Sequence, residues 1–418
     1  MFTKKEVQLP RKEESMKKRA FVFLISVFII ASGLKAGGWN NTLMGARAMA
    51  IGGAFVGLAD DPTAIFFNPA GVAYQENQFN FSIDGFYIWP THDYTSPAGS
   101  TAQSKFNTAL PQIFFTYRMN EKVTLGFGAF VPYAGGGVDW RKEDLGLPLK
   151  SYLAVISLSP SVAYQLNRTL SVGFNLNFYR GLLDVETEME GFGPLNAEES
   201  GSAISASLGL MYKPTEKLGI GFTVRAPAKM TLSGKTSIFQ TVPGFGTLKL
   251  NLESETSFNL PWDIEAGFSY RLTESFVFSA GAQYTMWSRL KQVDKTIKDI
   301  PTIGDINEAE VLNFNDILIL HAGFEYLIPG GIALRGGIGY DRSASPTDTL
   351  SVMNIDVDKL SLLGGIGYKT GKTQIDFVYI YVRGNEREKT SMVYPGMPLF
   401  EKYNLNVDIL GLGVTFSF

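Results

Sequence analysis

The sequence contains no cysteine, and that absence excludes several kinds of chemistry. Disulfides, thiolate metal sites and cysteine nucleophiles cannot form without it. Histidine is nearly as rare, because His92 and His321 are the only two, so no histidine-based metal site is expected. Neither has a neighbouring serine that suggests activation, and motifs of serine hydrolases, zinc proteases and phosphate-binding loops are missing. We therefore predict no enzyme, no catalytic residue, no cofactor and no metal.

Charged residues are also scarce. They make up 18% of the 418 residues, against about a quarter in typical soluble domains. The formal net charge is −3, and no basic cluster occurs beyond the N-terminus. Nothing in this pattern attracts a polyanion, so no nucleic-acid partner is expected.

Long apolar runs are missing except for one near the start, Ala20–Ala31. It is shorter than the roughly 20 residues that a membrane-spanning helix needs. Because Lys17, Lys18 and Arg19 precede it and small residues follow, we interpret residues 16–36 as a secretory signal peptide. Cleavage after Ala36 and cleavage after Gly33 are both compatible with the sequence, with Leu34 an imperfect −3 residue for the first, and residues 1–15 are interpreted as an upstream extension. The mature protein is therefore expected to leave the cytoplasm.

Glycine and aromatic residues are abundant, with 44 glycines and 13% aromatics. From residue 77 onward, apolar and small or polar residues alternate with period two, as in Leu170–Tyr179, Leu218–Arg225 and Ile332–Asp341. Several such segments exceed ten residues and carry bulky aromatics near their ends. This pattern is typical of strands that face lipid on one side and a polar interior on the other.

The connections between these segments alternate in length. Six are tight turns and seven are long, at approximately 91–105, 134–149, 187–200, 237–248, 291–310, 343–357 and 384–402. Outer-membrane barrels have an even strand number, short periplasmic turns and long external loops, whereas a soluble sandwich has no reason for this segregation. We predict an all-β fold: a transmembrane antiparallel β-barrel of about 14 strands over residues 77–418, with both ends on the short-turn side.

The last segment, Leu410–Phe418, alternates and ends on an aromatic residue. This ending resembles the signal read by the bacterial barrel-assembly machinery. The expected location is the Gram-negative outer membrane, reached by export, with the assembly machinery, membrane lipid and lipopolysaccharide as partners.

Residues 37–76 differ from everything after them, because they are rich in small apolar residues and lack alternation. Such a segment cannot form its own core, so we predict a hatch that plugs the barrel lumen. Asp60 and Asp61 are expected to cap a short element or pair with lumen arginines. The run Asn68-Pro69-Ala70-Gly71 predicts a turn, and both features together are predicted to form the gate.

Several motifs carry a family resemblance. They are Gly45–Ala73 with its acidic pair and NPAG turn, Val131–Tyr133 with Trp140, Leu158–Tyr164, Leu170–Gly173, Tyr284–Ser288, Leu334–Gly337 and Tyr340–Arg342. In order and spacing they resemble the FadL family of outer-membrane transporters for long-chain fatty acids and aromatic hydrocarbons. The resemblance implies a fourteen-stranded barrel with a hatch, ligand capture at external loops, and release through a gap at a kinked third strand. PorV-like barrels of secretion systems carry a similar acidic pair and NPAG block.

Two sets of residues are candidates for the gap and the ligand site. Gly126, Gly128 and Pro132 in the third strand make local unpairing inexpensive, although they also fit an ordinary strand end. The candidate ligand residues are the hatch and lumen aromatics and two inward arginines: Phe55, Phe66, Phe67, Trp287, Arg225 and Arg335. A guanidinium can bind a ligand carboxylate in bidentate fashion, or serve in a salt-bridge network between wall and hatch.

Two of the long connections also carry apolar residues. They are Leu145, Leu147 and Leu149 in one, and Phe239, Val242, Pro243 and Phe245 in the other. An apolar patch on external loops can be the first landing point of a hydrophobic ligand. Residues of this kind can equally well pack on each other.

The predicted function is passive uptake of long-chain fatty acids or similar hydrophobic compounds, gated by the hatch. A hydrophobic small molecule is thus the expected ligand. A PorV-like shuttle or scaffold barrel of a secretion system is the first alternative. A general porin is the second, and the apolar hatch argues against it.

Overall fold

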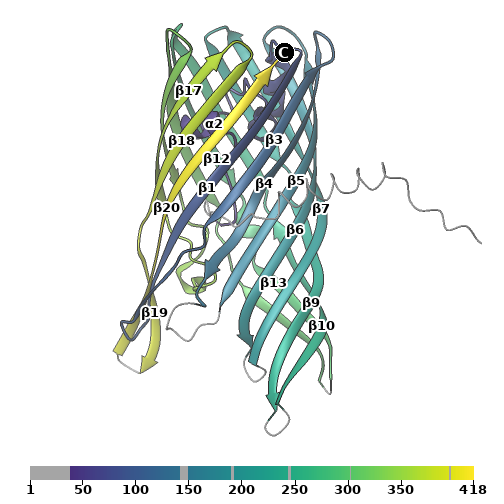
Figure 1. Ribbon diagram of the computed structural model, residues 1–418, viewed down its shortest axis with the longest axis vertical. Helices are drawn as coiled ribbons and strands as arrows, with labels where there is room; N and C mark the ends of the chain where they lie inside the picture. The colour runs from purple at the N-terminus through teal and green to yellow at the C-terminus, as the bar shows by residue number, and fades with distance from the viewer. Residues whose placement is uncertain (1–37, 142–148, 190–192, 243–245, 302, 395–396) are drawn as a thin grey trace, which may run out of the picture.

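The computed structural model describes residues 38–141, 149–189, 193–242, 246–301, 303–394 and 397–418. The predicted extension and signal peptide lie outside these residues. The described chain forms one sheet that closes on itself into a tall barrel (Figure 1). The ring closes where the first strand pairs with the last, with Phe81 opposite Phe416.

Fourteen strands make up the wall, and each pairs antiparallel with its neighbours around the ring. In ring order they are β1 (Phe79–Thr95), β3 (Thr108–Arg118), β4 (Val123–Asp139), β5 (Lys150–Gln165), β6 (Leu170–Met189), β7 (Gly193–Thr215), β8 (Leu218–Arg225), β11 (Asp263–Thr273), β12 (Phe276–Thr285), β15 (Ile317–Ile328), β16 (Ile332–Asp341), β17 (Lys359–Thr370), β18 (Thr373–Gly384) and β20 (Met397–Ser417). The predicted fourteen-stranded antiparallel barrel is confirmed.

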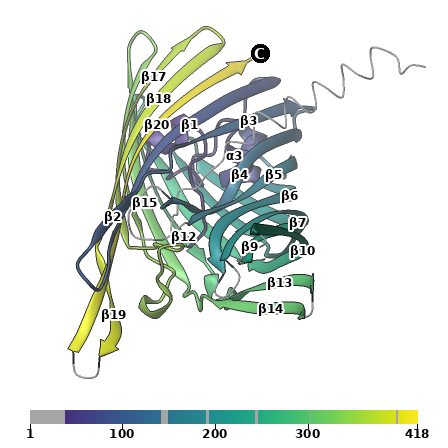
Figure 2. The ribbon, with the colours of Figure 1, turned by 60° about the horizontal axis from the view of Figure 1, so that its bottom comes forward.

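Six further strands lengthen the hairpins at the end of the barrel opposite the C-terminus (Figures 1 and 2). They are β2 (Thr101–Ser104), β9 (Ala228–Val242), β10 (Gly246–Leu260), β13 (Gln292–Ile300), β14 (Gly304–Val311) and β19 (Arg387–Tyr394). Much of what we expected to be long loops is therefore paired strand. Because these segments are polar, the sequence gives no strand signal for them. A hairpin in water needs no apolar stripe when its backbone groups pair with each other.

Alternation sorts side chains as predicted. Outward residues are apolar and exposed, with Leu208 at 61%, whereas inward polar residues are buried. Burial confirms that Arg225 and Arg335 face inward, and the alternation places other buried polar residues on the same face: Asn175, Asn177, Glu265, Gln283 and Asp376. Charge on the lipid side would cost about 2–4 kcal/mol per residue at the membrane midplane, which accounts for this sorting. No helix in the described ranges is long and apolar enough to span a membrane.

Residues 38–76 run inside the barrel near the end that carries the C-terminus (Figure 2). They form only short elements: α2 (Ala46–Ala50), α3 (Ala64–Phe67) and the 3₁₀ helix η1 (Pro69–Tyr74). Two other 3₁₀ turns, η2 (Trp287–Arg289) and η3 (Thr347–Thr349), lie in wall connections. Gly52 and Gly53 follow α2 at φ of 80° and 75°, which ends the helix because other residues rarely adopt that conformation.

Candidate functional site

The hatch backbone lies directly on the barrel wall, and glycines make this possible. An added Cβ at five inward wall glycines would come within 2.3 Å of a hatch backbone atom. These residues, called the glycine seat below, are Gly173, Gly219, Gly221, Gly323 and Gly337. At Gly221 the Cβ would be 1.8 Å from the Val56 carbonyl oxygen. The inward glycines of the alternating pattern therefore shape the wall to the hatch.

Wall side chains also hold the hatch backbone by hydrogen bonds. The Ser171 hydroxyl donates to the Ala70 carbonyl at 2.8 Å, and the Asn175 amide donates to the Ile65 carbonyl at 2.6 Å. The Ser269 hydroxyl donates to a hatch carbonyl on the other side of the lumen, that of Gly57, at 2.8 Å. Together with the glycine seat, these bonds attach the body of the hatch to wall strands on both sides.

The predicted turn Asn68-Pro69-Ala70-Gly71 forms the start of η1. The Asn68 side chain accepts from the Ala70 N–H at 3.1 Å and donates to the carbonyls of Val56 and Leu210, each at 3.0 Å. Pro69 occupies the first helical position, where its missing N–H costs nothing. Gly71 packs on Ala59, where a Cβ would be 2.3 Å from the carbonyl oxygen. The turn thus joins two hatch segments to the wall.

The acidic pair of the hatch binds an arginine that the sequence reasoning missed. Arg47, on α2, lies 2.5 Å from Asp60 and 3.3 Å from Asp61, and its Nε donates to Glu325 on β15 at 3.0 Å. Asp61 also accepts from the Thr63 N–H at 2.9 Å. Burial raises the pKa of the Asp61 carboxyl, and the Arg47 guanidinium opposes that rise. The expected pairing with a lumen arginine is thus made by Arg47 of the hatch, and the wall arginines Arg225 and Arg335 bind other carboxylates.

The two candidate arginines of the wall are occupied by protein groups. Arg335 donates to Glu325 and Asp376, each at 2.7 Å, and its side chain is 2% exposed. Arg225 donates to the Phe66 carbonyl at 3.2 Å and to Asp263 at 3.3 Å. Its guanidinium also lies 4.6 Å from the centre of the Phe66 ring. This geometry matches a network between wall and hatch.

The candidate aromatics fall into two groups. Phe66 contacts Phe67 and Phe130 edge-on, with ring centres 5.0 and 5.5 Å apart, and Phe55 joins them through Phe67 at 5.4 Å. Trp287 is fully buried elsewhere, in a packed aromatic cluster made by Trp39, Tyr133, Phe258, Trp287 and Phe314. Sequence reasoning missed Trp39, Phe258 and Phe314 as lumen residues, although Phe258 faces inward on a polar hairpin whose alternation could have shown it.

The third wall strand, β4, leaves its neighbour. Described pairing between β3 and β4 ends at Ile113–Ala129, and a bulge follows between Phe130 and Tyr133. The edge of β4 beyond that point is taken by the start of the hatch. The Asn41 N–H donates to the Pro132 carbonyl at 2.9 Å.

A second backbone bond, from the Ala134 N–H to the Trp39 carbonyl at 2.8 Å, completes this contact. Pro132 therefore lies at the break. Gly126 and Gly128 lie in the paired part, where a Cβ would come within 3.2 Å of Ile65 of the hatch. The three candidate residues of the gap are thus divided between the break and the hatch contact.

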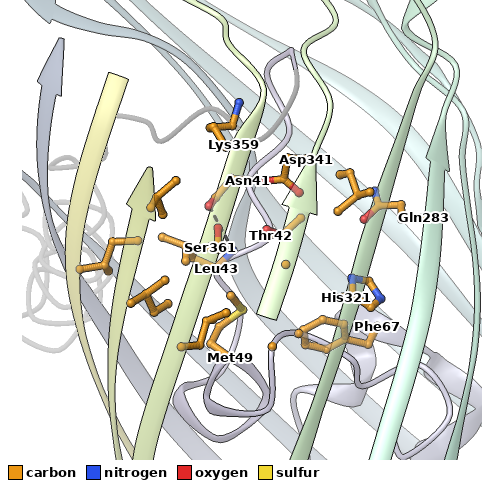
Figure 3. A pocket seen from close by; sticks show the side chains of 18 of the residues that line it. Asn41, Thr42, Leu43, Met49, Phe67, Gln283, His321, Asp341, Lys359 and Ser361 are labelled. Carbon is orange, nitrogen blue, oxygen red and sulfur yellow. Dashed lines mark hydrogen bonds between the residues drawn. The ribbon is translucent and has the colours of Figure 1, made fainter. Parts of the chain in front are cut away.

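A cavity of about 60 Å³ separates the hatch from the opposite wall (Figure 3). Hatch residues line one side, including Leu43 and Met49, and His321, Asp341 and Lys359 line the other. His321 Nε2 lies 3.4 Å from Glu265 Oε1. Sequence reasoning gave His321 no role, because its partner is distant in the chain. No group of side chains able to hold a metal ion occurs among the described residues.

A larger groove of about 240 Å³ opens in the extended hairpins. A smaller cavity of about 70 Å³ adjoins it and reaches Trp39 and Phe258. The two spaces share Leu183, Val185, Thr256, Lys295 and Met353, so they are continuous. The groove and the smaller cavity therefore lead from the extended hairpins to Trp39 and Phe258 of the aromatic cluster, and so to the start of the hatch.

Comparison with known proteins identifies the family of the chain. A sequence model of the family described as outer membrane protein transport protein (OMPP1/FadL/TodX) matches residues 22–418. The chain belongs to this FadL/TodX family.

Relatives agree with the assignment. The long-chain fatty acid transport protein of Escherichia coli O6:H1 is 25% identical over 413 residues, covering 87% of this chain and 90% of the relative. Alkane uptake protein A of Marinobacter nauticus is 27% identical over 298 residues, covering 66% of this chain and 63% of the relative.

A solved FadL homologue from Pseudomonas aeruginosa shares the fold, with a TM-score of 0.73 and 16% identity, covering 93% of this chain and 99% of that structure. The FadL/TodX match over nearly the whole chain confirms the resemblance seen in the sequence and the outer-membrane location. It also favours transport over the secretion-scaffold alternative.

Proposed function

We propose that this FadL/TodX barrel takes up long-chain fatty acids or similar hydrophobic compounds by passive diffusion through the wall. The observation that carries the proposal is the placement of three features: the external groove, the smaller cavity beside it that reaches Trp39, and the break where β4 leaves β3 and pairs with the segment of Trp39 instead. The E. coli relative is named for fatty acid transport and the Marinobacter relative for alkane uptake, which supports a hydrophobic cargo. A mostly apolar pocket with few polar groups is the usual form of such a site.

The start of the hatch is the moving part in this proposal. Two backbone hydrogen bonds attach Trp39–Asn41 to the edge of β4, and each contributes about 0.5–1.5 kcal/mol net. Trp39 belongs to the aromatic cluster and also lines the smaller cavity, so a hydrophobic molecule that enters this cavity competes with it for the same contacts. The remaining hatch stays on the glycine seat, which keeps water and small solutes out.

Capture is assigned to the extended hairpins and not to the apolar loop residues considered from the sequence. Of those seven residues, Leu149 and Phe239 have side chains in the described part of the structure, and the side chains of the other five lie outside it. Leu149 is buried in the barrel interior, and neither residue lines the groove. Release is assigned to the side of β4 at Pro132, next to the hatch contact of Gly126 and Gly128.

A reversible covalent lock tests the route. Asn40 and Tyr133 form an isolated antiparallel bridge flanked by the two backbone bonds. Opposed residues of this kind have Cα atoms about 4.5 Å apart, which a disulfide can span. Because the chain has no cysteine of its own, the double variant Asn40→Cys/Tyr133→Cys contains a single possible intramolecular pair.

We expect the oxidised double variant to lose uptake of labelled fatty acid and hydrocarbon in cells, and the reduced form to regain it. The reduced form of the same variant is the control for the two substitutions. Full uptake by the oxidised variant, with the disulfide verified by mass spectrometry, would show that the hatch segment need not leave β4.

A further inference from the structure

The external groove combines an apolar lining with an excess of acidic side chains. Its apolar lining comes from Leu183, Val185, Leu195, Ile297, Ile306 and Met353. Its charged lining consists of four glutamates and one lysine: Glu188, Glu199, Glu255, Glu308 and Lys295. The lysine ammonium is already 2.6 Å from a carboxylate outside this set, that of Glu310. Among the described lining residues, an incoming anion therefore meets carboxylates and no free cation.

Glu199 is the member of this set that points to a ligand. The residue, on β7, is 6% exposed, and its Oε2 atom has no hydrogen-bond partner among the residues that the structure describes. A buried carboxylate oxygen without a donor is costly, and hydrogen bonds to charged groups are stronger than those between neutral groups. A donor on a molecule in the groove would satisfy it. A carboxylate there would add like-charge repulsion.

The two lumen arginines considered for a ligand carboxylate do not offset the negative charge of the groove, because protein carboxylates already bind them. Arg225 and Arg335, the two cations in the lumen that were candidates for a ligand carboxylate, bind Asp263 and the Glu325–Asp376 pair. A carboxylate would have to displace one of these carboxylates to gain a salt bridge.

We propose that the external groove takes amphiphiles whose polar end is a hydrogen-bond donor, such as a long-chain amine or alcohol, and discriminates against carboxylates. Glu199 is the specificity-determining residue, because its free Oε2 receives the donor while the alkyl chain lies against the apolar lining. This inference rests on the proposed uptake of fatty acids or similar hydrophobic compounds, and within that range it ranks amines and alcohols above fatty acids at the groove.

The test uses the full chain in amphipol and isothermal titration calorimetry at neutral pH. Nonylamine, nonanol and nonanoate each contain nine carbon atoms in an unbranched chain, and their polar ends differ in charge and in hydrogen-bond donors. We expect nonylamine to bind at least about tenfold more tightly than nonanoate, with nonanol between them, as expected for a hydrogen bond to a charged group. Glu199→Gln should remove most of that preference.

Glu198→Gln is the matched control, because it removes one charge from the adjacent position of β7, which is exposed, does not line the groove and is screened by solvent. It should keep the preference for the amine. Equal or tighter binding of nonanoate by the unsubstituted chain overturns the head-group inference, as does an unchanged preference in Glu199→Gln. If none of the three compounds binds, the proposed uptake fails together with it. Heat-modifiable migration on gels verifies that each variant is folded.

Discussion

Replacing Gly221 by alanine is expected to open the plugged barrel to small solutes. The new Cβ would lie 1.8 Å from the Val56 carbonyl oxygen, a backbone atom that cannot rotate away. That carbonyl also accepts a hydrogen bond from the Asn68 side-chain amide at 3.0 Å, which holds it in place. The hatch must therefore lift from β8, while the outer face and ladder of the strand are unchanged. Conductance of the purified barrel in planar bilayers measures the leak.

The matched control is Gly364→Ala on β17, where an added Cβ meets nothing within 4 Å. This variant should stay closed and at least as stable, since alanine in a strand loses less conformational entropy on folding than glycine. If Gly221→Ala conducts no more than Gly364→Ala and binds hydrophobic compounds normally, the glycine seat does not hold the hatch. An unfolded Gly221→Ala product would instead make the hatch contact necessary for assembly, and the gel shift distinguishes the two.

Arg335→Met is expected to destabilise the barrel strongly. Arg335 is the buried cation between Glu325 and Asp376, and its removal leaves the Asp376 carboxylate with no cationic partner among the residues that the structure describes. Breaking a buried ion pair from one side costs about 3–5 kcal/mol, because the remaining charge stays desolvated. Urea-induced unfolding in lipid vesicles should show a free energy of unfolding lower by about that amount.

Two further variants separate charge from packing. Adding Asp376→Asn to Arg335→Met removes the uncompensated carboxylate and should restore part of the loss. Arg383→Met, at an exposed position on β18, should change the free energy of unfolding by no more than about 0.5 kcal/mol. A near-neutral Arg335→Met would mean that the guanidinium does not support the wall. In that case Arg335 would again be a candidate for binding a ligand carboxylate.

The sequence predicted the wall well and the extended hairpins poorly. Segments such as Leu170–Tyr179 alternate between lipid and lumen, so periodicity alone orients every side chain. Residues 291–310 have no such difference between faces, because water surrounds most of β13 and β14, and they were expected to be loop. Their pairing depends on backbone hydrogen bonds, which leave little trace in composition.

The sequence predicted which kinds of residue form the candidate site better than it predicted which residues contact each other there. Trp287 was expected in the lumen and is buried there, but its neighbour Trp39 comes from the start of the hatch. Asp60 was expected to meet an arginine, and it does, but the arginine is Arg47. Glu199 gave no signal at all, because its importance depends on which residues surround the groove.

The sequence by itself determined the strand number, the direction of each side chain and the presence of a plug, because strand periodicity and tight turns are properties of local stretches of chain. Only the tertiary structure decided which inward groups meet. Tyr133 donates to Asp263 at 2.9 Å across 130 residues, and Gly221 lies under Val56. The inward face carries residues of both charges and many glycines, so the sequence allows many different contacts between wall and hatch. Closure of the ring and the path of the hatch select one set of these contacts.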